Sequence, residues 1–424
     1  MTAFTRYNPN NKRNPEKASE PKPAKTAKHL PYKNLDIGAY VALHYGFTPT
    51  ETPEIKKVDL DHSKTLLDGD FVENEGENHA ILPLHVEEKV AVLRTYIERN
   101  MHTLPQPVMM YFKSSFKGSL VKKNHSYPRY GDLEIIGNPK SIAEATLIKT
   151  ALVILEDYGY KDLCVEINSI GDRESITKFT KELTAYYRKN IEHLSTHGRQ
   201  LLKKDVFELL THSDKKSDSL KEDAPKSITF LSEPSRIHFK EVLEFLEKLD
   251  IPYKINHHLI GNKKYCSETI FEIIHPANGK KKTECEILAL GIRYDGLARK
   301  IGLKKEVSGV GISLLFKRPA KEMVVAKVKT PILYFVQLGF EAKLYSLQII
   351  NILRRENIMV HQALSKDKLT AQLSVAERLK IPHMILIGKK EAMEESAIVR
   401  DMNTRSQETV PISELVRYVR RLGA

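Results

Sequence analysis

The chain has 424 residues, of which 41% are hydrophobic and 29% are charged. This length exceeds what one hydrophobic core supports, so we expect two or three domains. The composition excludes a chain that is disordered throughout. No apolar run approaches the ~18 residues of a membrane span, and the first residues lack the apolar stretch of a secretory signal, so we expect a cytoplasmic protein. The 67 Lys and Arg exceed the 54 Asp and Glu by 13, which favours an anionic partner such as nucleic acid.

The residue types that bind metals show no ligand pattern. Three cysteines occur, Cys164, Cys266 and Cys285, and no two of them have CxxC spacing. The 16 histidines are also scattered. We therefore expect neither a disulfide framework nor a metal site.

Residues 1–34 form a distinct basic segment, with eight Lys and Arg, two Glu and five Pro. Such a composition cannot bury a core, so we expect a disordered tail. The tail either adds sequence-independent affinity for RNA phosphates or only keeps the protein in solution.

The next part, residues 35–171, mixes helices and short strands. Apolar residues at three- to four-residue intervals predict helices, and short apolar runs predict strands. The expected elements are helix 35–46, helix 85–99, strand 108–112, strand 132–137, helix 141–157 and strand 163–167. Gly46 is the stop signal of the first helix.

Residues 172–238 change character, because they are mostly polar, highly charged and helical in pattern. We interpret them as a helical insertion between two parts of one sheet domain, 35–171 and 239–326. After the insertion we expect a helix at 239–250 and then strands at 253–260, 267–275, 282–290 and 310–316. Such a set favours a mostly antiparallel sheet.

The last hundred residues alternate strands with helices, from ILYFVQLG through HMILIG and AIVRDM to the helix ISELVRYVRRL. This order is typical of an α/β domain with a largely parallel sheet. We place the boundary near 327–331, so that this domain covers 330–424.

Three segments, LCVEINSIGDRES (163–175), GIRYDGLARKIG (291–302) and the C-terminal domain, together resemble histidyl-tRNA synthetase, a class II aminoacyl-tRNA ligase. The resemblance covers about 35–424. It implies an α+β antiparallel sheet domain with a helical insertion, followed by an α/β anticodon-binding domain. It also implies that histidine and ATP form an adenylate, whose histidyl group moves to tRNA, with Mg²⁺ accompanying ATP. Pro53 matches a proline at the family's dimer interface, so a homodimer is implied.

The resemblance assigns site residues where the family motifs match. Glu87 matches the glutamate that meets the histidine ammonium, and the other positions matched to the amino-acid pocket are Arg94, Glu134, Tyr265 and Tyr294. Arg318 matches the arginine on the ATP γ-phosphate, and Lys117 stands where an arginine contacts the α-phosphate. A lysine lacks the bidentate fork of arginine, so this exchange is not conservative.

A basic loop accompanies the second motif. Its lysines and arginine are compatible with contact to RNA phosphates, and they are equally compatible with a solvated loop. The residues concerned are Lys113, Lys122, Lys123 and Arg129, together with Lys117.

Other positions depart from the family pattern. Gly261 stands where the family has an arginine that promotes adenylate formation, and only Lys263 or Lys264 offers charge nearby. Ile292 and Leu315 replace glycines that lie against the ligands. Each lost preorganised cation should cost about 10²–10³ in rate.

Three functions fit these observations. The first is a histidyl-tRNA synthetase-like protein that binds tRNA while its aminoacylation activity is weakened or lost. The second is an active but divergent histidine–tRNA ligase in which lysines replace the lost arginines. The third is a histidine-sensing subunit like the regulatory protein of ATP phosphoribosyltransferase, a family that lacks an anticodon domain.

Overall fold

The computed structural model describes most of the chain from residue 29 onward. The described residues are 29–67, 86–113, 129–211, 218–276, 285–303, 306–317, 324–329, 331–362, 366 and 368–423. Residues 1–28 of the expected basic tail lie outside them. Among the described residues, no helix has the length and apolar character needed to cross a bilayer.

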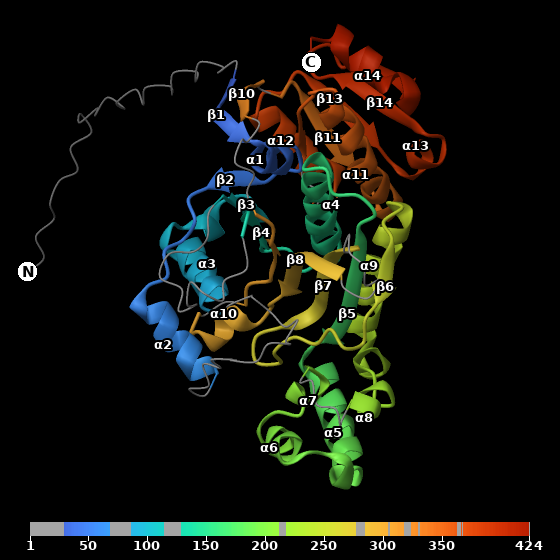
Figure 1. The fold of residues 1–424 in the computed structure, drawn as a ribbon. Coiled ribbons are helices and arrows are strands. Elements are labelled where there is room, and N and C mark those ends of the chain that lie inside the picture. Colours follow the sequence, from blue (N-terminus) through green and yellow to red (C-terminus); the bar gives the residue numbers. More distant parts are fainter. Residues whose placement is uncertain are drawn as a thin grey trace, which may run out of the picture.

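An eight-stranded sheet forms the centre of the larger part of the molecule (Figure 1). Its strands, in spatial order, are β2 (Thr48–Thr50), β3 (Val108–Phe112), β4 (Gly131–Ile136), β9 (Gly309–Leu314), β8 (Cys285–Arg293), β7 (Ser267–Pro276), β5 (Cys164–Gly171) and β6 (Tyr253–Ile255). Only the two edge pairings, β2 with β3 and β5 with β6, are parallel. The antiparallel sheet domain predicted from the sequence is confirmed.

Both faces of this sheet are covered, and β9 shows how the sequence divides between them. Val310, Ile312 and Leu314 belong to a core shared with helices α1 (Ile37–His44), α4 (Ile142–Asp157) and α9 (Glu233–Lys248). The intervening Gly309, Gly311 and Ser313 therefore face the other side, because successive strand residues point to opposite faces. Helices α3 (Val86–Glu98) and α10 (Leu297–Lys300) contribute to the core on that second side.

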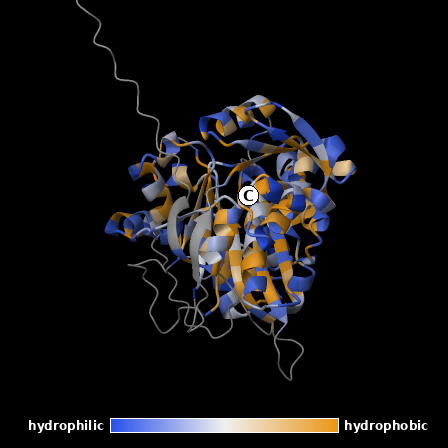
Figure 2. Cartoon of the chain, turned by 90° about the horizontal axis from the view of Figure 1, so that it is seen from above, coloured by the Kyte–Doolittle hydropathy of each residue, from blue (hydrophilic) through white to orange (hydrophobic). Residues whose placement is uncertain are grey.

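The distribution of apolar residues along the helices reflects how much of each helix is buried. In Figure 2 they carry both apolar and polar stretches, as expected where one side of a helix packs inward. Helix α4 lies between the sheet and the C-terminal part, and 13 of its 16 residues are buried. Helix α9 begins at Glu233, earlier than predicted, because Ser232 caps it by accepting from the Ser235 backbone N–H.

Residues 172–238 contain the expected helices, which project at one end of the molecule (Figure 1). They are α5 (Arg173–Lys189), α6 (Thr196–Lys204), α7 (Glu208–Thr211) and α8 (Asp218–Glu222). Helix α5 starts where the Asp172 side chain accepts from the Ser175 N–H, and it buries Phe179, Leu183 and Tyr187. A further helix, α2 (Lys57–Leu66), was not predicted. The strand predicted over 253–260 is reduced to the three residues of β6.

The C-terminal part is built on a second, five-stranded sheet. Its spatial order is β12 (Val360–Gln362), β11 (Leu333–Gln337), β13 (His383–Ile387), β14 (Ser396–Asp401) and β15 (Gln407–Pro411). Helices α11 (Phe340–Arg355), α12 (Leu369–Arg378), α13 (Lys389–Met393) and α14 (Ile412–Arg421) complete it. The expectation of a largely parallel sheet was half right, since β14 and β15 pair antiparallel.

The start of the described chain corrects one expectation. Residues 29–34 were assigned to the disordered tail, but they belong to strand β1 (His29–Asp36). This strand pairs antiparallel with β10 (Val324–Lys329), just before the C-terminal part. Backbone pairing with a distant segment orders residues whose own composition could not.

Candidate functional site

A buried charged cluster lies where β4 and β8 meet helix α3. The Tyr294 hydroxyl donates to Glu134 Oε2 at 2.7 Å. The Lys89 ammonium forms an ion pair with Glu134 Oε1, and the Lys89 and Glu134 side chains are 1% and 0% exposed. Lys89 Nζ also lies 5.7 Å from the centroid of the Tyr294 ring, within the range of a cation–π interaction. The predicted residues Glu134 and Tyr294 thus come together, with Lys89 between them.

Two glycines of β9 create the room for this cluster. Gly311 is the strand partner of Glu134, and a Cβ there would lie 2.1 Å from a Glu134 carboxylate oxygen. A Cβ on Gly309 would lie 2.3 Å from the Tyr294 ring. Any side chain at either position would displace the carboxylate or the ring, so the pocket requires glycine at both.

The other two pocket residues predicted beside them, Glu87 and Tyr265, lie close to each other. Both are buried. Burial raises the pKa of Tyr265 well above its usual value, and the negative charges of Cys266 and Glu87 add to the shift. Burial likewise raises the pKa of Tyr294, with Glu134 contributing. Both phenols therefore stay protonated at neutral pH.

Arg94, also predicted for the amino-acid pocket, makes its contacts with neighbouring residues of the chain. Its guanidinium pairs with Asp59 at 2.8 Å and with Glu98 at 2.7 Å, and it donates to the Glu54 carbonyl at 2.7 Å. These contacts join α3 to α2, the helix that the sequence analysis missed. The Arg94 side chain is 14% exposed.

Arg129 corrects the expectation of a solvated, RNA-facing loop residue. Its guanidinium is bidentate on Glu88, at 2.6 and 2.8 Å, and it also meets Asp132 and the Ser313 hydroxyl. The side chain is 9% exposed. Burial would lower the pKa of Arg129, but Asp132 and Glu88 raise it above its usual value. Both terminal nitrogens of this guanidinium are therefore engaged inside the protein.

Gly261, which the resemblance matches to an arginine of the family, is closely packed. A Cβ on Gly261 would lie 2.7 Å from Cys266 Sγ and from Ile270 Cδ1. Lys263, which we considered as a substitute cation, pairs with Asp205 at 2.8 Å and lies over the Phe207 ring. Its charge is thus directed toward the helical insertion.

The remaining predicted cations divide into two groups. Arg318, Lys117, Lys122 and Lys123 lie outside the described residues. Lys113 is half-exposed and pairs with the buried Asp36 at 2.8 Å.

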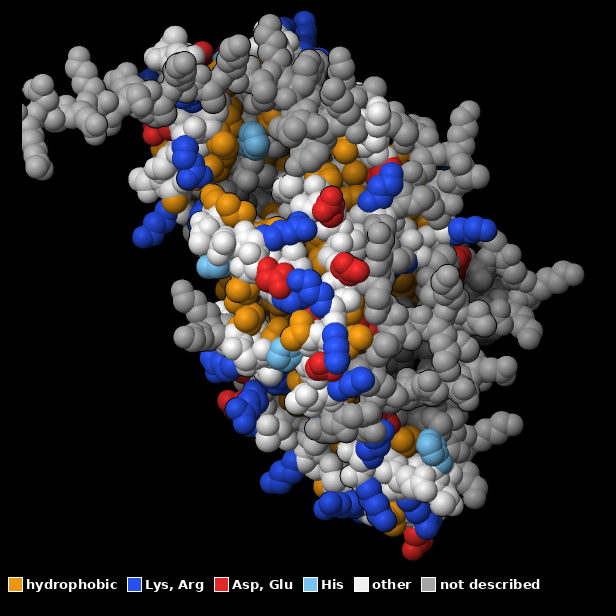
Figure 3. Space-filling model, turned by 90° about the vertical axis from the view of Figure 1, so that its left-hand side faces the viewer, with side chains coloured by type: hydrophobic (Ala, Val, Ile, Leu, Met, Phe, Trp, Pro, Cys, Tyr) orange, Lys and Arg blue, Asp and Glu red, His pale blue; other side chains and the backbone are white. Residues whose placement is uncertain are grey.

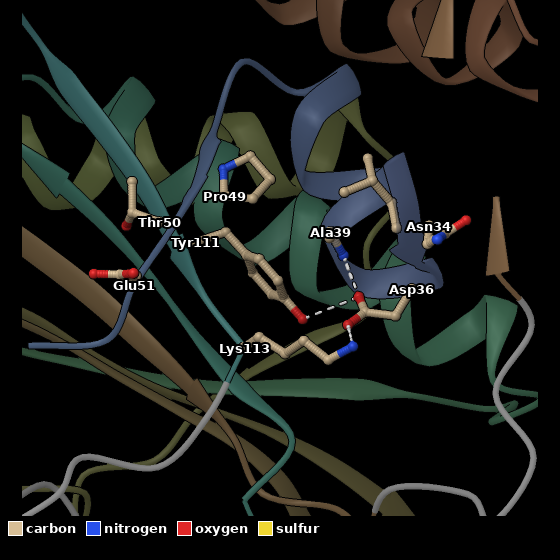
Figure 4. Close-up of a pocket in the computed structure, with 9 residues that line it drawn as sticks. Asn34, Asp36, Ala39, Pro49, Thr50, Glu51, Tyr111 and Lys113 are labelled. Carbon is tan, nitrogen blue, oxygen red and sulfur yellow. Dashed lines mark hydrogen bonds and ion pairs between the residues drawn. The ribbon is translucent and has the colours of Figure 1, made fainter. Parts of the chain in front are cut away.

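Figure 4 shows Lys113 and Tyr111 pointing toward Asp36 at a surface cavity of about 300 Å³. Tyr111 belongs to the core on the opposite side of the sheet from Glu134, whose strand partner is Met110. The cavity is therefore separate from the buried cluster.

Comparison with known proteins finds relatives that match nearly the whole chain. The family model described as anticodon binding domain matches residues 325–422. Histidine–tRNA ligase of Fervidobacterium nodosum is 29% identical over 382 residues, covering 87% of this chain and 89% of that protein. The enzyme of one Dehalococcoides mccartyi strain is 26% identical over 408 residues, covering 90% and 93%. A solved structure of apo S. aureus histidyl-tRNA synthetase is 23% identical, covers 89% and 92%, and has a TM-score of 0.49.

The chain thus combines a mostly antiparallel sheet domain with a C-terminal anticodon-binding domain. Over nearly its whole length its sequence is similar to histidine–tRNA ligases, in line with the resemblance of its motifs to histidyl-tRNA synthetase.

Proposed function

We propose that this protein binds tRNA and that its histidine–tRNA ligase activity is weakened or lost. The observation that carries the second half is the closed position at Gly261. Adenylate formation brings a carboxylate against the α-phosphate of ATP, so the transition state needs fixed cations. Glycine supplies no cation at this position, and a Cβ there would lie 2.7 Å from the Cys266 and Ile270 side chains, so a larger residue would require both neighbours to move.

The carboxylates near Arg129 and Lys89 also support weakened ligase activity. Of the described acidic residues on this face, Glu88 and Asp132 are engaged by Arg129, and Glu134 by Lys89. Both oxygens of Glu88 and of Glu134 are thus engaged, which leaves only Asp132 Oδ2 among these carboxylates as an open oxygen of the kind that Mg²⁺ prefers. If ATP binds, Arg318 and Lys117 are the residues we expect at its phosphates.

Binding of tRNA is assigned to the anticodon-binding domain and to the basic surface. Helix α14 buries Leu415 and Val419 and exposes Arg417 and Arg421. On the face shown in Figure 3, Lys and Arg side chains are more widespread than Asp and Glu. Such a surface gains affinity from phosphate contacts regardless of sequence.

The test uses the purified full chain beside an intact histidyl-tRNA synthetase. We expect histidine-dependent ATP–pyrophosphate exchange at background level, together with saturable binding of tRNA in a filter titration. Binding should weaken at least about tenfold between about 50 and 200 mM salt. Exchange as fast as in the intact enzyme would overturn the loss of activity and favour an active, divergent ligase.

The binding surface is tested by charge reversal. Arg417→Glu with Arg421→Glu should weaken tRNA binding by about tenfold or more, because two phosphate contacts become repulsive. Lys181→Glu with Arg188→Glu, two exposed positions on α5, is the matched control. Equal affinity in both double variants and the unmodified chain would refute the assignment.

The homodimer remains a proposal that rests on the resemblance. Pro53, the residue matched to the dimer interface, is buried within the single chain. Sedimentation equilibrium measures the mass directly, and a value of 48.4 kDa would exclude the dimer.

A further inference from the structure

The buried cluster around Glu134 already contains an ammonium group, and that group belongs to the chain itself. Lys89 pairs with Glu134, while Tyr294 donates to the second carboxylate oxygen. We propose that Lys89 is an internal substitute for an ammonium ligand and that it excludes amino acids from this pocket. The proposal rests on the proposed function, because it identifies a residue that keeps the ancestral substrate site shut.

The chemistry of the pocket fits an ammonium group and little else. Glu134 is fully buried and accepts from both sides, so it needs a cation whenever it is ionised. An ammonium carries three donors and no acceptor, and it is favoured over an aromatic face such as that of Tyr294. The α-ammonium of an amino acid and the ε-ammonium of a lysine offer the same donors.

The position of Lys89 in its helix supports a dedicated role. It is the fourth residue of α3, which starts at Val86. A cation in the first helical turn opposes the helix dipole, which favours negative charge there, as Glu87 and Glu88 provide. The contact with Glu134 on β4 compensates for this unfavourable position.

A second feature distinguishes this pair from an ordinary surface ion pair. The Lys89 side chain is 1% exposed, and its partner is completely buried. Glycine at 309 and 311 leaves room only for the Tyr294 ring and the Glu134 carboxylate. An incoming amino acid could pair with Glu134 only by displacing the Lys89 ammonium from it.

The test is chemical rescue of a shortened side chain. In Lys89→Ala, n-butylammonium supplies an ammonium on an alkyl chain one carbon longer than the part removed, and n-butanol serves as its uncharged counterpart. We expect n-butylammonium to raise the Tm of Lys89→Ala by about 2 °C or more, in a concentration-dependent manner. It should leave the Tm of the unmodified chain and of Lys178→Ala, an exposed lysine on α5, unchanged.

Two further variants define the pocket. Lys89→Met fills the space without charge, so n-butylammonium should not stabilise it. Lys89→Ala with Glu134→Gln removes the carboxylate, so rescue should be lost there as well. Binding of L-histidine, followed by equilibrium dialysis, should be detectable in Lys89→Ala and at least about tenfold weaker in the unmodified chain.

Three results would overturn the proposal. One is histidine bound equally well by the unmodified chain and by Lys89→Ala. Another is a folded Lys89→Ala that responds equally to n-butylammonium and n-butanol. The third is a Lys89→Ala that fails to fold even when it is prepared in n-butylammonium, while Lys89→Met with Glu134→Gln folds. A tRNA titration on the same samples tests the proposed function separately, since its failure would not alter the rescue.

Discussion

Replacing Arg293 by methionine should be among the most damaging single changes in the sheet domain. The guanidinium makes two 2.6 Å bonds to Glu144, and neither side chain is exposed. It also donates to the Asn138 carbonyl at 3.1 Å. Arg293 is thus the main cation that makes a buried carboxylate on α4 tolerable, and it directly precedes Tyr294 of the buried cluster.

The magnitude follows from what remains after the change. Burial would raise the pKa of Glu144, but Arg293 and then His238 hold it below its usual value. Without Arg293, Glu144 keeps only His238 at 2.8 Å and the Thr269 hydroxyl at 2.6 Å. A buried pair broken on one side costs about 3–5 kcal/mol, so we expect a loss in that range.

Urea unfolding followed by far-UV circular dichroism measures this loss; the chain has no tryptophan to report by fluorescence. Arg236→Met is the control, because Arg236 and Glu233 are 67% and 63% exposed and their pair should contribute about 0–1 kcal/mol. Arg293→Met with Glu144→Gln should recover part of the loss. A cost below about 1 kcal/mol for Arg293→Met would refute the reasoning.

Three other outcomes are expected from the same contacts. Gly261→Arg should restore no ATP–pyrophosphate exchange and should lower stability by about 1–3 kcal/mol, measured by urea unfolding, since its side chain collides with Cys266. Burial and then Glu166 raise the pKa of Glu272 to about 8, so stability should fall as pH rises from 4.5 through 8, and Glu272→Gln should flatten that slope in a pH series of Tm values. The depressed pKa of Glu144 stabilises the fold above 4.5, so the chain should lose stability as pH falls below that value, and Glu144→Gln should lose less over the same acid range.

Local patterns predicted the elements that carry a clear period. The strand at 108–112 and the helix at 141–157 were found within one residue of their expected limits. Pairings between distant segments were not visible, because a single sequence does not state which backbone groups meet. Strand β1 is ordered by β10, nearly 300 residues away, and β14 and β15 add antiparallel to a sheet whose first three strands are parallel.

The sequence predicted which residues belong to the candidate site, but it did not predict their contacts. Motif matches assigned both Glu134 and Tyr294 to the amino-acid pocket, and in the structure the two side chains are joined by a hydrogen bond. The contact of Lys89 with Glu134 depends on the approach of α3 to β4, which periodicity cannot supply. Arg129 was misjudged for a related reason, since a basic run gives no information on which side chain turns inward.

Two neighbouring residues at the start of α3 form ion pairs with residues in or near β4, and the charges of these pairs decide what the site attracts. Glu88 and Lys89 are consecutive. Arg129, the partner of Glu88, lies just before β4, and Glu134, the partner of Lys89, lies in β4. Among the described residues, these two pairs and Asp132 place two cations against three carboxylates, a formal excess of one negative charge. On their own, these described groups do not attract an anionic nucleotide. We therefore place the proposed recognition of tRNA on the basic exterior and the C-terminal domain of a chain whose overall charge is +13.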